Sequence, residues 1–230
     1  MHLSSHSEKV AELYRAWASV YDESVAVGVP YRLEEGILVS AIHAESGEVI
    51  LDLGCGTGRT IEKLISSGAE ITGIDLSNEM LAIARKKFPG VSFIQGNVEQ
   101  ALPFSDGGFD KVVASLLFQF LPDLRAPLGE IVRVLRPEGT LYVTDFISDA
   151  PLDWSLVETR LPRKFKGSVG SLSTLRTLVD YVELFTHAGL RIARLEPLRV
   201  RENCFDILTE SSYAKVQGNW ASALFVLQKI

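Results

Sequence analysis

The sequence predicts an α/β fold in which a parallel β-sheet is covered by helices on both faces. The chain has 230 residues, 47% of them are hydrophobic, and strand-like apolar runs alternate with segments of helical periodicity. A chain of this length can bury one sizeable core. Alternating strands and helices favour parallel strands joined by crossovers. Repeats, low-complexity tracts and a linker are absent from the sequence, so one domain over residues 1–230 is the simplest interpretation.

The first expected strand and the turn after it, residues 49–58 (VILDLGCGTG), are the most informative segment. An apolar strand carries Asp52 near its end, and three glycines at alternate positions follow. Glycine adopts positive φ at little cost and leaves no Cβ in the way of a ligand. We expect a helix from Gly58 to about Ser67, with Thr57 as its cap. A nucleotide-like ligand at this edge of the sheet is the natural interpretation.

The turn does not match the dinucleotide pattern G-x-G-x-x-G. Counted from Gly54, the third glycine of that pattern falls on Arg59, and counted from Gly56 it falls on Ile61. A carboxylate at Asp52 repels a pyrophosphate but suits a ligand with an ammonium group. The predicted ligand is therefore nucleoside-like and carries no polyphosphate.

Four further elements follow in order: ITGIDLS (71–77), FIQGNVEQALPF (93–104), FDKVVASLLFQFLPD (109–123) and LRPEGTLYVTDF (135–146). With the glycine turn, they make the chain resemble the class I S-adenosylmethionine-dependent methyltransferases, particularly the small-molecule, ubiquinone/menaquinone-biosynthesis-like or "type 11" branch. The resemblance covers residues 49–147 well. It implies a Rossmann-like, seven-stranded, mostly parallel sheet, with a sixth strand at about 190–196. The last strand, at about 221–228, would be antiparallel and lie at the edge.

The resemblance also implies S-adenosylmethionine as the cofactor and assigns its contacts. Asp52 and the turn would hold the methionine end, and Asp75 would accept hydrogen bonds from the ribose hydroxyls. Leu76 would pack on the adenine face, and the Asn97 amide oxygen would accept from the exocyclic amine beside Val98. The family more often has Asp at position 97. The full set of expected cofactor-binding residues is Tyr14, Tyr21, Asp52, Gly54, Cys55, Gly56, Gly58, Asp75, Leu76, Asn97, Val98 and Ser115.

The candidate catalytic residues implied by the resemblance are Gln119, Asp145 and Tyr21. Gln119 would lie near the sulfonium with Ser115, at a place where many relatives carry His. Asp145, at the end of the fifth strand, can act as a base or only orient its loop. The four histidines (His2, His6, His43, His187) nominate no base, although a closing N-terminal helix can bring His6 to the site. An in-line displacement mainly needs positioning and exclusion of water.

Residues 1–48 are expected to form a helical cap with one helix over 7–24 and another near 31–44. In relatives such a helix closes over the cofactor, with an aromatic residue before an acid, and Tyr14 and Tyr21 fit that description. The alternative for these tyrosines and for Trp17 is ordinary packing. The paired acids at 34 and 35 are expected on a solvated helix surface, so no metal site is predicted.

Residues 148–230 are expected to complete the sheet and to form a lid over the acceptor. The segment 148–170 carries a basic run (Arg160, Arg163, Lys164, Lys166) that is either a solvated face or a site for a carboxylate, phosphate or carrier. The segment 171–190 is expected to be a helix whose apolar stripe (Leu175, Leu178, Val179, Val182, Phe185) packs on the sheet and which stops at Gly189.

The composition limits the classes of partner that are expected. The net charge of −6 disfavours a nucleic-acid surface. Two cysteines without framework spacing, no signal peptide and no stretch of 18 apolar residues indicate a cytoplasmic protein without a membrane span. The expected partner is a small-molecule acceptor, apolar or aromatic, with a carrier-bound or anionic acceptor as runner-up. The assembly state is open, with a homodimer as one option. Three alternatives also stay open: a redox enzyme using a dinucleotide, an RNA methyltransferase, and an S-adenosylmethionine-binding protein that transfers no methyl group.

Overall fold

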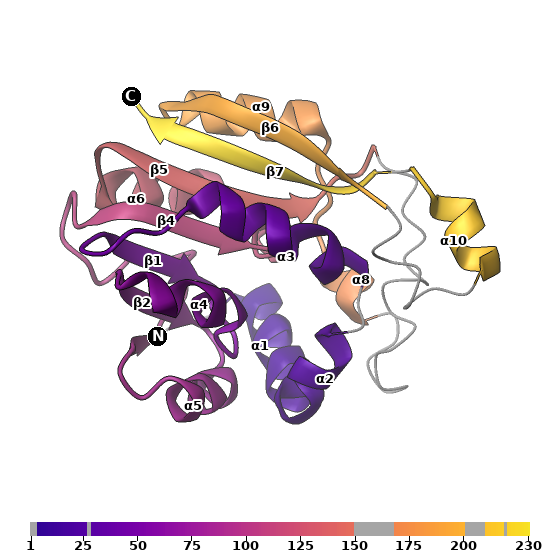
Figure 1. The fold of residues 1–230 in the computed structure, drawn as a ribbon, viewed down its shortest axis with the longest axis horizontal. Helices are drawn as coiled ribbons and strands as arrows, with labels where there is room; N and C mark the ends of the chain where they lie inside the picture. Colours follow the sequence, from indigo (N-terminus) through magenta and orange to yellow (C-terminus); the bar gives the residue numbers. More distant parts are fainter. Residues whose placement is uncertain (1–3, 27–28, 150–167, 201–209, 219) are drawn as a thin grey trace.

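A computed structural model describes residues 4–26, 29–149, 168–200, 210–218 and 220–230. Seven strands form one sheet in the order β3-β2-β1-β4-β5-β7-β6 (Figure 1). The strands are β1 (Val49–Leu53), β2 (Glu70–Asp75), β3 (Ser92–Gln95), β4 (Phe109–Ser115), β5 (Leu135–Phe146), β6 (Leu190–Arg199) and β7 (Trp220–Lys229). The predicted α/β class and the mostly parallel sheet are confirmed.

The longer helices are α1 (Ser5–Trp17), α3 (Val29–Ile42), α5 (Asn78–Lys87), α6 (Arg125–Val134) and α9 (Leu178–His187). Shorter ones are α2 (Tyr21–Val25), α4 (Arg59–Leu64), α8 (Ser168–Leu172) and α10 (Glu210–Val216), with single 3-10 turns η1 (Ala18–Val20), η2 (Ile65–Ser67) and η3 (Phe118–Phe120). None of the helices in the described ranges is long and apolar enough to cross a membrane.

The position of β7 corrects the sequence-based topology. β7 is antiparallel, as expected, but it pairs with β5 on one side and β6 on the other, so β6 is the edge strand. Burial gives the reason: successive residues of β7, from Ala223 to Phe225, are fully buried, which means that both faces of the strand are covered. Such a strand belongs inside a sheet, whereas in β6 only Leu190 and Leu198 are buried.

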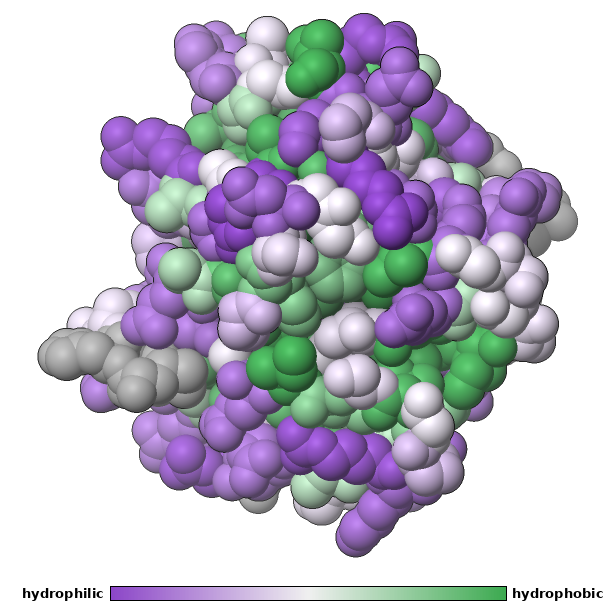
Figure 2. All heavy atoms as spheres, turned by 90° about the vertical axis from the view of Figure 1, so that its left-hand side faces the viewer, coloured by the Kyte–Doolittle hydropathy of each residue, from purple (hydrophilic) through white to green (hydrophobic). Residues whose placement is uncertain are grey.

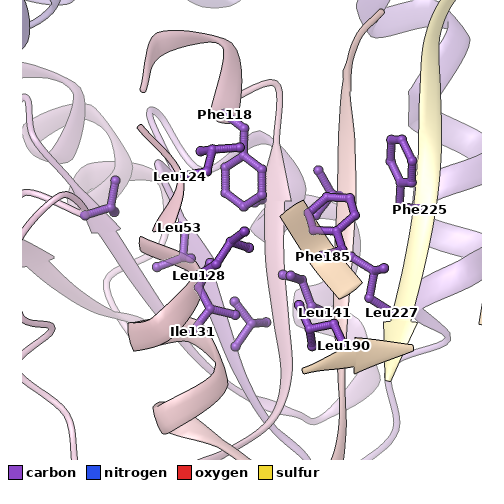
Figure 3. Packing of buried hydrophobic residues seen from close by; sticks show 14 of the residues in the cluster. Leu53, Phe118, Leu124, Leu128, Ile131, Leu141, Phe185, Leu190, Phe225 and Leu227 are labelled. Carbon is purple, nitrogen blue, oxygen red and sulfur yellow. The ribbon is translucent and has the colours of Figure 1, made fainter. Parts of the chain in front are cut away.

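Each face of the sheet has its own apolar core. On one face α6 and α9 pack on the strands, and Figure 3 shows the ring of Phe118 there near Leu128 of α6, and the rings of Phe185 and Phe225 near Leu227 of β7. On the other face α3, α4 and α5 contribute Leu38, Ile42, Ile61, Leu64 and Leu81. The sheet is therefore buried on both sides, which leaves its ends for ligands. Figure 2 views the end of the sheet at which the parallel strands begin, and it shows small apolar areas between hydrophilic residues.

One helix prediction is wrong, and so is the cap predicted for another helix. The helix expected over 171–190 begins only at Leu178, because Thr177 and Asp180 form a capping box there; Leu175 lies before it and Val179 is 62% exposed. The predicted stop at Gly189 is confirmed, with φ of 81°. The helix expected from Gly58 to about Ser67 is confirmed, as α4 continued by the 3-10 turn η2, but Thr57 does not cap it.

Candidate functional site

A cavity lies at the carboxyl ends of β1, β2 and β4, beneath α1 and α2. Its walls come from the glycine turn, from the residues after β2, β3 and β4, and from the N-terminal helices. Among the expected site residues, those that line it are Tyr14, Tyr21, Asp52, Gly54, Cys55, Gly56, Asp75, Leu76, Asn97, Val98, Ser115 and Gln119. Gly58 and Asp145 do not line it.

The glycine turn is built for close approach. Gly54 has φ of 64°, and a Cβ there would lie 2.7 Å from the side chain of Leu117. Gly56 has φ of 54°, and a Cβ there would meet nothing within 4 Å, so the space above it is open. Gly58 also has positive φ, but a Cβ there would collide with Phe88, which indicates a packing requirement. The open backbone at Gly56 gives a ligand room to lie against the turn.

Asp52 is a buried carboxylate with an unsatisfied oxygen. It is 2% exposed, and its Oδ2 has no hydrogen-bond partner. Burial raises its pKa to about 7, against the opposing effect of Arg59. An unpaired buried carboxylate is costly unless a partner of opposite charge arrives. The site therefore fits a ligand that brings an ammonium group.

Asp75 fixes the turn from the next strand. Its Oδ2 accepts a hydrogen bond from the Gly56 amide and its Oδ1 accepts one from the Ser77 amide, both at 2.8 Å. Burial raises the pKa of Asp75, while these amides oppose the rise. A carboxylate has about four lone-pair sites, so Asp75 can still accept hydrogen bonds from a ligand hydroxyl.

Asn97 and its neighbours form the adjacent wall. The Asn97 Oδ1 accepts a hydrogen bond from the Glu99 amide at 3.0 Å, which closes a tight turn after β3. The expected acceptor oxygen therefore has a protein donor and keeps one lone pair for the cavity. Val98 is buried beside it, and Leu76 lines the cavity from the end of β2.

A buried polar cluster of Glu34, Arg59, Ser115 and Thr144 lies between α3, α4 and the ends of β4 and β5. Glu34 has no exposed surface, forms an ion pair with Arg59 and accepts hydrogen bonds from the hydroxyls of Ser115 and Thr144. The prediction of a solvated Glu34 is therefore wrong. One signal was available in the sequence: Glu34 shares a helix face with Leu38, four residues on. Its partners are 25 to 110 residues away, which local patterns do not reveal.

Aromatic side chains from the N-terminal helices form the roof. Tyr14 makes an edge contact with Phe120, with ring centroids 5.5 Å apart, and Trp17 makes one with Tyr21 at 4.9 Å. Trp17 is 4% exposed and its Nε1 donates to Ser24 at 2.7 Å, so it packs in the cap and lines the cavity as well. Burial raises the pKa of Tyr14 and of Tyr21 well above 10, which keeps both phenols neutral.

Polar contacts attach the N-terminal helices to the rest of the molecule. The Thr57 hydroxyl donates to Asp22 at 2.5 Å, and Lys87 pairs with the other oxygen of Asp22 at 3.1 Å. Thr57 does not cap α4 because its hydroxyl bonds to α2 instead. The hydroxyl of Ser7 donates to Glu99 near the amino end of α1. The N-terminal helices are thus attached at the glycine turn, at α5 and after β3.

The turn after β4 is held from below by Asp145 and Arg176. The Asp145 carboxylate accepts hydrogen bonds from the amides of Gln119 and Phe146 at 2.8 Å, and it is fully buried outside the cavity. Burial raises its pKa to about 7. The Arg176 guanidinium donates to the carbonyls of Phe118, Leu121 and Pro122. These contacts tie Asp145 to the loop after β4, which agrees with the loop-orienting alternative expected for it. The sequence does not reveal the role of Arg176, because its place in the segment 171–190 suggests only a position on the surface of a helix.

Other groups that could act as a nucleophile or a base either do not line the cavity or are in an unreactive protonation state. Burial raises the pKa of the Cys55 thiol well above 9, so Cys55 is a poor nucleophile at neutral pH. His6 contacts the Phe120 carbonyl at 3.1 Å but does not line the cavity. Over the described parts of the chain, no group of three His, Cys, Asp or Glu is arranged to hold a metal. The basic run at 160–166 lies outside the described residues.

Comparison with known proteins gives consistent matches. The model of a "Methyltransferase domain" family matches residues 51–143. The demethylmenaquinone methyltransferase of Renibacterium salmoninarum is 31% identical over 147 residues, which cover 63% of this chain and 61% of that protein. The O-methyltransferase cnsE of Penicillium expansum is 30% identical over 197 residues, which cover 82% of this chain and 68% of that protein. The chain thus covers less than two thirds of the first relative and slightly more of the second.

A solved structure extends the likeness over almost the whole chain. It is the complex between the Haloferax volcanii Trm112 methyltransferase activator and a methyltransferase, with a TM-score of 0.74 and 22% identity. The match covers 94% of this chain and 96% of that one. At this identity the likeness is one of fold.

Proposed function

Because the chain belongs to the class I S-adenosylmethionine-dependent methyltransferases, we propose that it transfers the methyl group of that cofactor to a small apolar or aromatic acceptor. The unsatisfied Asp52 oxygen beside the open backbone of Gly56 carries the proposal. It is a buried acid next to a surface that a nucleoside can approach. The methionine end of S-adenosylmethionine brings the ammonium group that such a site needs.

The remaining contacts of the cofactor follow from the walls of the cavity. Asp75 can still accept hydrogen bonds from the ribose hydroxyls, and Leu76 offers an apolar surface for the adenine ring. We expect Asn97 and Val98 to meet the edge of that ring, since both line the cavity. The aromatic roof of Tyr14, Trp17 and Tyr21 covers the cavity, as expected for a site that excludes water.

Positioning is the chain's main catalytic contribution. S-adenosylmethionine supplies a methyl group on a sulfonium sulfur, which is already activated for in-line displacement. Gln119 lines the cavity and is fixed by its amide on Asp145 and by Ser173, whose hydroxyl donates to the Gln119 Oε1 at 3.1 Å. The neutral tyrosines and the buried thiol are poor bases at neutral pH. An acceptor that ionises readily, such as an acidic phenol, suits this site better than an aliphatic alcohol.

The character of the cavity supports an apolar or aromatic acceptor. Aromatic side chains that line it are Tyr14, Trp17, Tyr21, Tyr31, Phe120 and Phe146. Aromatic faces stack on planar rings and contribute about 0.5–1.5 kcal/mol per pair beyond burial. The named relatives, a demethylmenaquinone methyltransferase and an O-methyltransferase, are in keeping with such acceptors. The runner-up, a carrier-bound or anionic acid, rests on the basic run at 160–166.

The proposal is tested in two steps. Calorimetric titration with S-adenosylmethionine and S-adenosylhomocysteine should give micromolar binding, and NADH should give no heat. Release of S-adenosylhomocysteine is then followed with naphthols, phenols and a carrier-bound acid as acceptors. Turnover with the aromatic panel supports the proposal, and turnover with the carrier-bound acid alone favours the runner-up. Binding of the cofactor without turnover on any acceptor would favour a non-methylating use of the site.

A further inference from the structure

Arg59 is the one cationic side chain among the described residues that line the cavity. The acidic side chains there are Asp52, Asp75 and Glu99. Asp75 holds two backbone amides, and Glu99 accepts from Ser7. A ligand with both a positive and a negative group therefore meets one carboxylate that lacks a hydrogen-bond partner, Asp52, and one cation, Arg59.

The orientation of Arg59 is fixed by the buried polar cluster. Its Nη2 forms the ion pair with Glu34 and donates to the Ser115 hydroxyl at 2.8 Å. Its guanidinium carbon lies 4.9 Å from the centre of the Tyr31 ring. Guanidinium carries five N–H donors, and these two bonds both use the same nitrogen. The side chain is 20% exposed, while that of Glu34 is 1% exposed, so the arginine is the member of the pair that reaches the cavity.

Charge balance links Arg59 to Asp52. The positive charge of Arg59 lowers the pKa of Asp52 against the effect of burial, so the two groups are near enough to interact. An amino acid that placed its ammonium group on Asp52 would also bring a carboxylate into this buried region. That carboxylate needs a cation or several N–H donors to replace its water. Arginine offers both, in a fork that matches a carboxylate.

We propose that Arg59, held in place by Glu34, binds the carboxylate of the cofactor's methionine end while Asp52 binds the ammonium group. The inference rests on the proposed function, since it concerns the same cofactor. Arg59 is a cofactor-binding residue in this assignment and Glu34 is a positioning residue. Glu34 comes from α3, outside the glycine turn, and its role is to orient the guanidinium and to offset its charge.

Two ligands that differ only in the carboxylate measure how much that group contributes to binding. S-adenosylhomocysteine has the complete amino-acid end, and decarboxylated S-adenosylhomocysteine keeps the ammonium group but lacks the carboxylate. In calorimetry of the unaltered chain, the decarboxylated ligand should bind about 10- to 100-fold more weakly. Equal affinities would overturn the inference and leave the proposed function standing. Absence of binding by both ligands would overturn the two together.

Variants then assign the effect to Arg59. Arg59→Met should bring the ratio of the two affinities to within about threefold of one. Arg125→Met is the matched control, because Arg125 is an exposed arginine paired with its own acid, Asp123; its ratio should equal that of the unaltered chain. If Arg59→Met keeps the full ratio, the carboxylate is bound elsewhere and the inference is wrong.

Glu34 needs its own variants, since the single arginine change leaves a buried carboxylate unpaired. The double variant Arg59→Met, Glu34→Gln removes both charges and gives the same ratio test in a chain without that penalty. Glu34→Gln alone keeps an acceptor for Ser115 but no longer neutralises the guanidinium. We expect it to lower the ratio several-fold through misorientation of Arg59. An unchanged ratio in Glu34→Gln would refute the positioning role.

Discussion

A buried carboxylate without a partner, such as Asp52, destabilises the ligand-free protein in order to recognise a cation. At the residue scale this predicts a pH-dependent affinity. Its pKa of about 7 means that cofactor binding requires loss of a proton below that pH. The dissociation constant of S-adenosylhomocysteine should therefore fall as the pH rises from 6 to 8, by at most about tenfold per unit. Calorimetry at intervals of half a pH unit measures this.

The controls for Asp52 are a variant and a ligand. Asp52→Asn should abolish the dependence between pH 6 and 8 and weaken binding at pH 8. 5′-Methylthioadenosine, which has no amino-acid end, should bind independently of pH in that range. A pH profile in Asp52→Asn that matched the unaltered chain would assign the titration to another group.

The raised pKa of Asp52 also makes the stability of the folded protein depend on pH. Its pKa is raised from 3.8 in the unfolded chain to about 7 in the folded protein. Stability from this group is therefore complete below pH 4 and is lost as the pH rises through 7. In the ligand-free protein, Asp52→Asn should raise the free energy of unfolding by about 1–3 kcal/mol at pH 8 and change it little at pH 4. Urea unfolding at the two pH values tests it, and equal effects at both would contradict it.

Asp75 carries a second residue-scale prediction. Asp75→Ala should weaken binding of S-adenosylhomocysteine by about 1.5–3 kcal/mol, the range for hydrogen bonds to a charged group. The structure adds that the same carboxylate holds the amides of Gly56 and Ser77, so Asp75→Asn is the gentler companion variant. Adenosine, which shares the ribose, should lose affinity in parallel. Unchanged affinity in both variants would refute the assignment.

At the scale of elements, the turn η3 depends on a partner outside its own segment. Arg176 donates to three carbonyls in residues 118–122, and Asp145 accepts an amide of the same turn. Arg176→Met removes one donor from each of these carbonyls and should lower the free energy of unfolding by about 3 kcal/mol. Urea unfolding measures the loss. Arg125→Met, on the exposed end of α6, should change it by less than about 0.5 kcal/mol.

Elements with strong local signals were predictable from the sequence. β5 occupies the predicted range 135–146, and Gly189 ends α9 as expected. Thr57 failed as a cap because its hydroxyl binds Asp22, 35 residues away. Glu34 was misplaced for the same reason. The residues that line the cavity follow from the glycine turn and strand ends, whereas partners supplied by α2, α3 and Arg176 depend on tertiary contacts that a local pattern does not contain.

At the scale of the whole molecule, the N-terminal helices stand apart from the sheet. α1 and α2 share a small apolar cluster, centred on Leu13, Trp17 and Val25, which touches the rest of the molecule only at Phe120 of η3 and Val169 of α8 among its buried members, and polar contacts add to this attachment. We expect residues 5–25 to exchange amide hydrogens faster than β4 and β5 in the ligand-free protein. S-adenosylhomocysteine should slow exchange in residues 5–25 and in the glycine turn, but not in β6 or β7. Slowing spread evenly over the sheet would contradict a cap that opens independently.

The interior place of β7 has a consequence for synthesis. β5 ends at Phe146, but its neighbour in the sheet begins only at Trp220. At about 5–20 residues per second, the ribosome takes roughly 4–15 seconds to make the intervening chain. During that interval β5 presents a free edge that contains Leu141 and Val143, both fully buried in the finished protein. Unpaired edges of this kind are templates for strand addition by other chains. The nascent protein is therefore most exposed to misassembly after the methyltransferase motifs are complete and before β7 emerges.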